Sequence, residues 1–324
     1  MPKLDTMNSA NGGFIPQHLL LFGPPFVGKT TLIGTATEEY DILFFDLEQS
    51  IKALLKLPIE QQHKITLIPV MDTIENPRAI KLLDKVLKGG TFKTCDGHGE
   101  LMCPSCLRAG STEWTEFTIP TSLSAESSKL VVAIDSGSQL TISANSAANL
   151  LLTNITSPEA LPFKGKGFDS FAEWGAQGKM LTRILSTIQN APYHVIMTAH
   201  ESEGKREDDS LRISPSIGTT TYGVNCGKYF DHVIYMDKVN NKHVAYSDTG
   251  FSNKIITGSR TDIAIEGMEV PSLLPFLRGE HNVGKDSAGI IRAQQAQQVL
   301  NQVQSSAASE ARAVVKQPFK FGNK

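Results

Sequence analysis

Short apolar runs alternate along the chain with segments in which apolar residues recur every three or four positions. Five runs have the length and apolar content of buried strands: residues 17–22, 42–46, 65–70, 130–134 and 194–198. Four segments have the spacing of helices: residues 29–38, 76–88, 138–152 and 171–189. Strands that alternate with helices predict an α/β fold with a mainly parallel central sheet and helices on both faces.

The second half of the chain continues this pattern less regularly. After residue 200 the chain is polar, and we expect a mobile loop over residues 201–218. Three further strands are expected: residues 230–236, 243–247 and 254–257. Residues 89–128, rich in Gly, Cys, Thr and Ser, interrupt the alternation and are interpreted as an insertion into the core.

The two ends of the chain differ from the core in composition. Residues 1–16 are expected to form a flexible N-terminus. Gln, Ala and Ser dominate residues 287–313, and from residue 285 onward the chain carries six basic side chains against two acidic ones. We therefore expect a core over residues 17–284, followed over residues 285–324 by a helix and a disordered basic tail.

The overall composition narrows the class of protein. The chain has 324 residues, 40% of them hydrophobic, which suits one large domain with extensions. No apolar run approaches the roughly 20 residues that a membrane span needs, and residues 1–13 lack the apolar stretch of a signal peptide. We therefore expect a cytoplasmic protein without membrane contact. The net charge of −2 excludes the global basic surface of a dedicated duplex-DNA binder, so any nucleic-acid contact is expected to be local.

A glycine-containing turn lies between the first expected strand and the first expected helix. It fits the P-loop pattern G-x-x-x-x-G-K-[ST], in which backbone N–H groups surround phosphates, the lysine reaches the β- and γ-phosphates and the hydroxyl binds Mg²⁺. The alternative is a chance match in a Gly/Pro turn, but the strand before the turn and the helix after it favour a nucleotide site. The expected nucleotide-binding residues are Gly23, Pro24, Pro25, Phe26, Val27, Gly28, Lys29, Thr30 and Thr31.

Two acidic residues follow expected strands at the same edge of the sheet. Asp135 ends the run at residues 130–134, where a carboxylate can hold Mg²⁺ beside the P-loop together with Thr30. Glu48 lies just past the run at residues 42–46, where a carboxylate can polarise an attacking water. From the residues alone, the alternatives are a strand-terminating turn aspartate and a solvated loop acid.

The order of these motifs resembles the RecA-type ATPases. That order is a P-loop, a strand ending in Asp-x-Glu, an apolar strand ending in Asp-Ser, and a strand ending in Thr-Ala-His-Glu. The start Gly-Pro-Pro-x-x-Gly-Lys-Thr-Thr, the pair Trp174-Gly175 and the segment His-Val-Ile-x-Thr-Ala-His-Glu are similar to phage-encoded members linked to single-strand annealing and recombination. The resemblance covers roughly residues 17–265.

This resemblance implies a RecA-like core with ATP and Mg²⁺ as ligands. Glu48 matches the family's catalytic base, Asp135 its magnesium-binding aspartate and His200 its γ-phosphate sensor, while Lys29 would neutralise the phosphates. Homo-oligomers assembled around single-stranded DNA are also implied. Two departures from the family are the insertion at residues 89–128 and the lack of an obvious N-terminal oligomerisation domain.

Three of the four cysteines lie in the insertion, close to a histidine. Cys95 and His98 form one close pair and Cys103 and Cys106 form another, which is enough for a tetrahedral structural Zn²⁺ site. The insertion has few apolar residues, and a bound zinc would make up that deficit. Free thiols in a loop, beside a solvated His98, are the alternative.

DNA contacts are implied by the resemblance in two loops, at about residues 153–170 and 201–222, where basic side chains can bind phosphates. The candidates are Lys164, Lys166, Lys205, Arg206 and Arg212. An ordinary solvated loop is the alternative, since the second loop is also rich in acids. In the same family a cation from the neighbouring subunit reaches the γ-phosphate. Lys254 and Arg260 are the candidates here, with surface salt bridges as the alternative.

One function unites these features best: an ATP-hydrolysing RecA-like protein that acts on single-stranded DNA in phage recombination, annealing or replication. A helicase-like DNA motor subunit stays open as an alternative. So does a nucleotide-gated binding module that recruits a DNA-processing partner, such as a single-strand-binding protein, through the zinc insertion or the basic tail.

Overall fold

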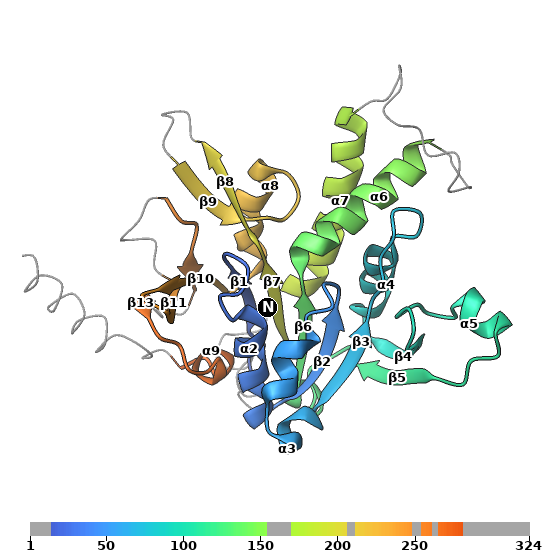
Figure 1. The fold of residues 1–324 in the computed structure, drawn as a ribbon, viewed down its shortest axis with the longest axis horizontal. Helices are drawn as coiled ribbons and strands as arrows, with labels where there is room; N and C mark the ends of the chain where they lie inside the picture. Colours follow the sequence, from blue (N-terminus) through green and yellow to red (C-terminus); the bar gives the residue numbers. More distant parts are fainter. Residues whose placement is uncertain (1–13, 154–169, 206–210, 248–253, 261–264, 281–324) are drawn as a thin grey trace, which may run out of the picture.

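The computed structural model describes most of the expected core (Figure 1). The described residues are 14–153, 170–205, 211–247, 254–260 and 265–280. The predictions for residues 1–13 and for the tail at residues 285–324 lie outside the described residues. None of the described helices is long and apolar enough to cross a membrane.

A mainly parallel sheet forms the centre of the molecule, which confirms the predicted α/β fold. Its strand order is β13-β11-β10-β1-β7-β6-β2-β3, with β12 paired to β10. The strands from β10 to β3 in this order run parallel, and β11, β12 and β13 add antiparallel pairs at one end. β7 separates the P-loop strand β1 from β6, an order consistent with a RecA-like core. The strands are β1 (His18–Phe22), β2 (Asp41–Asp46), β3 (Ile65–Pro69), β6 (Leu130–Asp135), β7 (His194–Ala199), β10 (His232–Val239), β11 (Lys242–Tyr246), β12 (Gly258–Ser259) and β13 (Glu266–Met268).

Helices cover both faces of this sheet (Figure 1). The α-helices of the core are α2 (Lys29–Gly34), α3 (Ile59–Gln62), α4 (Arg78–Val86), α6 (Gly137–Thr153), α7 (Ser170–Gln189), α8 (Thr220–Asn225) and α9 (Leu274–Leu277). Short 3₁₀ helices are η1 (Thr35–Glu38), η2 (Ile51–Lys56), η3 (Ser127–Lys129) and η5 (Cys226–Tyr229). The helix expected at residues 29–38 is therefore α-helical only as far as Gly34 and continues as 3₁₀ helix.

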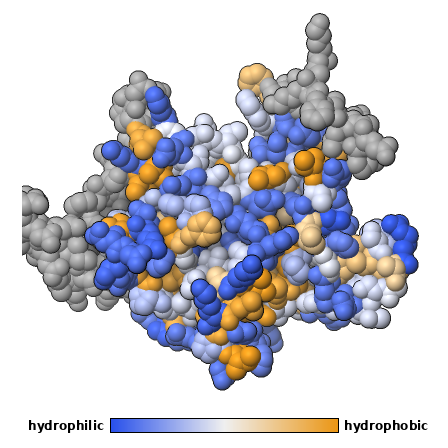
Figure 2. Space-filling model, viewed as in Figure 1, coloured by the Kyte–Doolittle hydropathy of each residue, from blue (hydrophilic) through white to orange (hydrophobic). Residues whose placement is uncertain are grey.

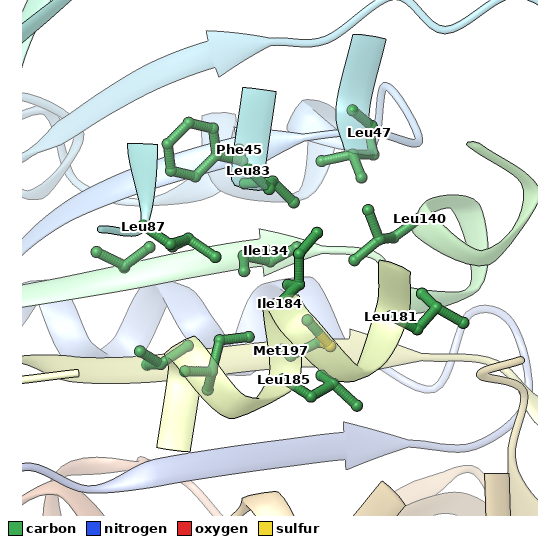
Figure 3. Close-up of a cluster of buried hydrophobic side chains, with 14 of the residues drawn as sticks. Phe45, Leu47, Leu83, Leu87, Ile134, Leu140, Leu181, Ile184, Leu185 and Met197 are labelled. Atoms are coloured by element: carbon green, nitrogen blue, oxygen red, sulfur yellow. The ribbon is translucent and has the colours of Figure 1, made fainter. Parts of the chain in front are cut away.

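Alternate side chains of the strands build one core on each face of the sheet. On β1, Leu20 and Phe22 belong to the core beneath α4, α6 and α7, whereas Leu19 and Leu21 belong to the core beneath α2 and α9. Figure 3 shows the first of these cores, in which Leu83, Leu140, Leu181, Ile184 and Leu185 of the helices meet Phe45, Ile134 and Met197 of the strands. The apolar runs in the sequence are thus strands buried on both faces, as parallel sheets require.

Two small antiparallel hairpins stand apart from the main sheet. The expected insertion forms β4 (Gly90–Cys95), α5 (Pro104–Arg108) and β5 (Trp114–Ile119), and it projects beside β3 (Figure 1). The second hairpin consists of β8 (Glu201–Lys205) and β9 (Leu211–Pro215), which follow directly after β7.

Two expectations about the later chain are wrong. The loop expected over residues 201–218 contains the β8–β9 hairpin, whose first strand is entirely polar and is held by backbone pairing from Glu201↔Pro215 to Lys205↔Leu211. The strand expected at residues 254–257 is absent from the described structure. There Ile255 makes one bridge to Ile213 and packs against the core, which explains its apolar character without a strand.

The surface seen in Figure 2 is mainly hydrophilic, with hydrophobic residues in small groups. One such group lies at the bottom of this view, near α3. Leu55 of η2 and Ile59 of α3 are each 60% exposed. Small apolar groups are ordinary on a domain surface and need no special explanation.

Candidate nucleotide site and candidate metal centre

The P-loop turn lies at the carboxyl edge of the sheet, between the end of β1 at Phe22 and the start of α2 at Lys29. Gly23 has φ 148°, and a Cβ there would lie 2.0 Å from the carbonyl oxygen of Met236 on β10, so only glycine fits. Gly28, with φ 87°, precedes the first residue of α2. The turn therefore has the backbone form that leaves N–H groups available to an anion at a helix start.

The P-loop turn is packed against the sheet on one side and exposed at its tip. The His243 ring of β11 packs against Gly28, and its Nδ1 lies 2.9 Å from the carbonyl oxygen of Val27. Phe26, in contrast, is 96% exposed at the tip of the turn with φ 65°. One side of the turn is thus held by a strand of the sheet while its tip faces solvent.

The ammonium of Lys29 lies over the turn. Its Nζ donates hydrogen bonds to the carbonyl oxygens of Gly23, at 2.9 Å, and Pro24, at 2.7 Å. Burial lowers the pKa of Lys29, and the nearby carboxylates of Asp135, Glu48 and Glu201 oppose that shift. The buried cation therefore lies among three acids at the edge where the turn would hold phosphates.

Asp135, at the end of β6, accepts hydrogen bonds from three hydroxyl groups. Thr30 and Ser50 donate to its Oδ2 over 2.7 Å and 2.5 Å, and Thr198 on β7 donates to its Oδ1. The neighbouring carboxyl of Asp46 has a raised pKa because it is buried, and the charge of Asp135 adds to the effect. Hydroxyl and carboxylate oxygens are ligands that Mg²⁺ prefers, so Thr30 and Asp135 fit a magnesium ion beside the turn.

Glu48 and His200 lie next to each other on the same edge. The Nε2 of His200 is 3.2 Å from Glu48 Oε1, and the hydroxyl of Ser136 donates to the same oxygen. The backbone N–H of His200 donates to the hydroxyl of Ser138 over 2.9 Å, which holds the end of β7 beside α6. The structure thus brings together the expected base and the expected sensor, although their roles stay predictions.

Several residues of this site carry no signal of their own in the sequence. Thr198 and Ser50 support Asp135, and Ser136 supports Glu48. Glu201 accepts a hydrogen bond of 2.8 Å from the Tyr235 hydroxyl on β10 and adds a further carboxylate near Lys29. Only the strand order, which aligns the ends of β2, β6, β7 and β10, reveals that these side chains meet.

The four expected zinc ligands converge in the insertion. One ligand atom from each of Cys95, His98, Cys103 and Cys106 can be chosen so that all lie within 4.8 Å of one another. From His98 Nδ1 the distances to the three Sγ atoms are 3.8 Å to Cys95, 3.5 Å to Cys103 and 3.3 Å to Cys106. Tetrahedral zinc bonds would separate such N and S atoms by about 3.6 Å, so the four groups fit a zinc ion.

The thiols of this cluster interact strongly. Burial, together with the adjoining Cys103 and Cys95 thiols, raises the pKa of Cys106 to about 12. Cys103 is the N-cap residue of the short helix α5 and Cys106 lies within that helix, so these two ligands lie about one turn apart. A bound cation is what allows such thiols to ionise together.

Lys254 and Arg260 are the two candidates for a cation that reaches the γ-phosphate of a neighbouring subunit. Arg260 lies 3.6 Å from Asp231, which also contacts His18 at the start of β1, so Arg260 lies at the opposite end of the sheet from the P-loop of its own subunit. Lys254 accepts a backbone hydrogen bond of 2.6 Å from Ile213 of β9. A contact of either cation with a neighbouring subunit stays a prediction.

Of the candidate DNA contacts, the structure describes two. Lys205 ends β8, and Arg212 lies on β9 opposite Gly204. The other three, Lys164, Lys166 and Arg206, lie outside the described residues. The two described cations therefore lie on one hairpin that begins one residue after His200.

Comparisons with known proteins assign no family to this chain. No protein-family model matches it, and no curated protein matches it significantly. Among solved structures, the flagellar accessory protein FlaH from Methanocaldococcus jannaschii is similar over 82% of this chain and 90% of its own, with 11% sequence identity and a TM-score of 0.35. Similarity at this level assigns neither a family nor an activity.

Proposed function

We propose that this protein is a magnesium-dependent ATPase of the RecA type that acts on single-stranded DNA. The observation that carries the proposal is that two pairs of polar side chains lie together at one edge of a parallel sheet. Thr30 and Asp135 are 2.7 Å apart beside the P-loop, and Glu48 and His200 are 3.2 Å apart nearby. A phosphate-binding turn, an oxygen pair suited to Mg²⁺ and a water-polarising carboxylate are the parts that phosphoryl hydrolysis needs.

Each residue has a task in this proposal. The backbone of the turn and Lys29 would hold the phosphates, and Thr30 and Asp135 would hold the magnesium ion. Glu48 accepts the proton of the attacking water, and His200 keeps the Glu48 carboxylate in place. A bound Mg²⁺ would neutralise charge on the phosphate oxygens.

The DNA part of the proposal is supported by the β8–β9 hairpin. It follows His200 directly and carries Lys205 and Arg212, so nucleotide and DNA contacts would share one continuous segment. Homo-oligomers around the strand, as in the RecA type, would supply further cations. Phage recombination or annealing is the setting that we propose for this activity.

The test is the rate of ATP hydrolysis by the full chain, with and without Mg²⁺ and with and without single-stranded DNA. Glu48→Gln should lower the rate by about 100-fold or more while ATP binding persists, because a general base contributes that much. The matched control is Glu60→Gln, since Glu60 lies on α3 and is exposed. Equal rates for Glu48→Gln and the unaltered protein would refute the catalytic assignment.

The measurements with single-stranded DNA test the DNA part of the proposal separately. Stimulation of hydrolysis by single-stranded DNA is expected, together with annealing of complementary strands. If hydrolysis is unaffected by DNA, the ATPase proposal stands and the DNA proposal fails. Unwinding of a duplex without annealing would favour a motor instead.

We also propose that the cluster in the insertion holds a structural zinc ion. Cys103→Ser should reduce the zinc content of the purified protein to well below one ion per chain, measured by elemental mass spectrometry, because three ligands bind zinc far more weakly than four. Cys226→Ala is the control, because Cys226 is a buried cysteine on η5 and lies outside the insertion. Equal zinc content in both variants would contradict the site.

A further inference from the structure

A groove crosses the helical face of the molecule between α4 and the pair α6–α7. These three helices lie side by side on one face of the sheet (Figure 1). The groove has a volume of about 550 Å³, within the range of ligand pockets. Its apolar lining comes from Pro77, Ile80, Ala147, Leu150, Leu151 and Met180. Leu151 is 64% exposed, so part of this apolar surface faces solvent.

Two further hollows adjoin the groove, and each shares two basic residues with it. Beyond Lys88 and Arg183, which it shares, lies a hollow of about 430 Å³ bounded by Pro120 and Thr121. Beyond Lys81 and Lys85, which it also shares, lies a hollow of about 200 Å³ that reaches the insertion at Leu101. The groove and the two hollows adjoin one another through these shared basic side chains, and we call the three together the trough. Three adjoining hollows suit a chain-like ligand better than a compact one.

The rim of the trough is basic. Lys81, Lys85 and Lys88 lie along α4 and its end at spacings of four and three residues, so they share one side of the helix. The one acidic side chain of the main groove, Asp84, already contacts Arg183 at 2.5 Å and Lys88 at 3.4 Å. Glu100, which lines the smallest hollow, is paired with Arg78 at 2.8 Å, so the rim keeps a surplus of positive charge.

We propose that this trough binds an acidic peptide segment of a partner protein, with its apolar side chains on the floor and its carboxylates against the rim. The apolar floor and the basic rim complement such a segment in both respects. Single-stranded nucleic acid fits less well, because none of the described lining residues is aromatic and bases would find no stacking surface. The trough lies on the face opposite α2, so peptide and nucleotide would bind independently.

The test uses the full chain and a fluorescein-labelled helical peptide of Glu with Leu at every third or fourth position. Fluorescence anisotropy should show saturable binding that weakens as salt is added. A second peptide in which every Glu is Lys, and a third in which every Leu is Ser, should bind at least about tenfold more weakly. These peptides separate the contribution of charge from that of the apolar floor.

Variants of the protein locate the binding surface. Lys81→Glu combined with Lys85→Glu should weaken the acidic peptide at least about tenfold, as should Leu151→Ser. Lys129→Glu is the control, because Lys129 is an exposed lysine on η3 outside the trough. All of these side chains are exposed, and circular dichroism should show unaltered folding. ATP hydrolysis without peptide should be the same in every variant.

Three outcomes would overturn the proposal. The first is equal affinity for the Glu and Lys peptides, or for the trough variants and the unaltered protein. The second is competition by a labelled single-stranded oligonucleotide that is lost in the same variants, which would assign the trough to nucleic acid. The third is absence of peptide binding together with a fall in solution mass in Leu151→Ser, which would assign it to contact between copies of this chain.

Discussion

Replacing Thr198 with Val removes one hydroxyl from the support of Asp135. Thr198 is completely buried on β7, and it donates a hydrogen bond to Asp135 Oδ1, whereas Thr30 and Ser50 donate to the other oxygen. The substitution changes the side-chain shape very little. It leaves a buried carboxylate oxygen without the donor that β7 supplies.

The expected effect follows from that geometry. A hydrogen bond to a charged group contributes about 1.5–3 kcal/mol, and a buried acceptor left unsatisfied loses most of that amount. We therefore expect the free energy of unfolding to fall by about 2 kcal/mol. Because Asp135 would also be held less firmly, the Mg²⁺ concentration for half-maximal ATP hydrolysis should rise.

Urea unfolding followed by circular dichroism measures the first effect, with an unaltered dependence on urea as the sign that the fold is the same. Thr187→Val is the matched control, since the Thr187 hydroxyl bonds only to the Arg183 carbonyl oxygen of its own helix among the described contacts, at 2.9 Å. That control should change stability by less than about 0.5 kcal/mol. A loss just as small in Thr198→Val would refute the idea that β7 supports the Asp135 carboxylate.

Further expectations concern pH and the glycines. Burial lowers the pKa of His194 and of His232 from 6.5 to about 4, so the unfolded chain binds more protons below pH 6.5 and stability is lost as pH falls from there towards 4. The free energies of unfolding measured by urea titration at pH 7.5 and pH 5 should differ by at most about 2 kcal/mol per histidine, and a free energy of unfolding that rises on acidification would contradict this account. Gly23→Ala should abolish ATP binding or folding, because its Cβ would meet the Met236 carbonyl oxygen. Gly175→Ala, with open space around it on α7, should instead raise stability by about 0.5–1 kcal/mol in thermal melts, and equal losses in both variants would contradict the steric argument.

The sequence predicts well those elements that are determined by neighbouring residues in the chain. Apolar runs such as residues 130–134 are buried on both faces of the sheet, and the glycine turn at residues 23–28 has its own backbone signature. The hairpin at Glu201 escaped prediction because its ladder depends on backbone pairing rather than on side-chain pattern.

The hydrogen bonds that hold Asp135 in the candidate site could not be predicted from local sequence patterns. Thr198 and Ser50 reach Asp135 from separate strands and loops, so no spacing along the chain links them. Their placement follows only from the order of strands in space. The zinc candidates lie at the other extreme, since all four ligands lie within one short segment and spacing alone predicts the cluster.

The register of the β4–β5 hairpin has a consequence for the modularity of this protein. Gly90 pairs with Ile119, so the insertion leaves and re-enters the core at neighbouring points. Antiparallel partners lie about 5 Å apart, a gap that a short linker closes. The whole insertion, with its candidate metal centre, can therefore be exchanged without altering the path of the core strands, provided that apolar side chains of similar size take the places of Phe117 and Ile119 in the core. The insertion is in this sense a separate unit that can be replaced while the central sheet is kept.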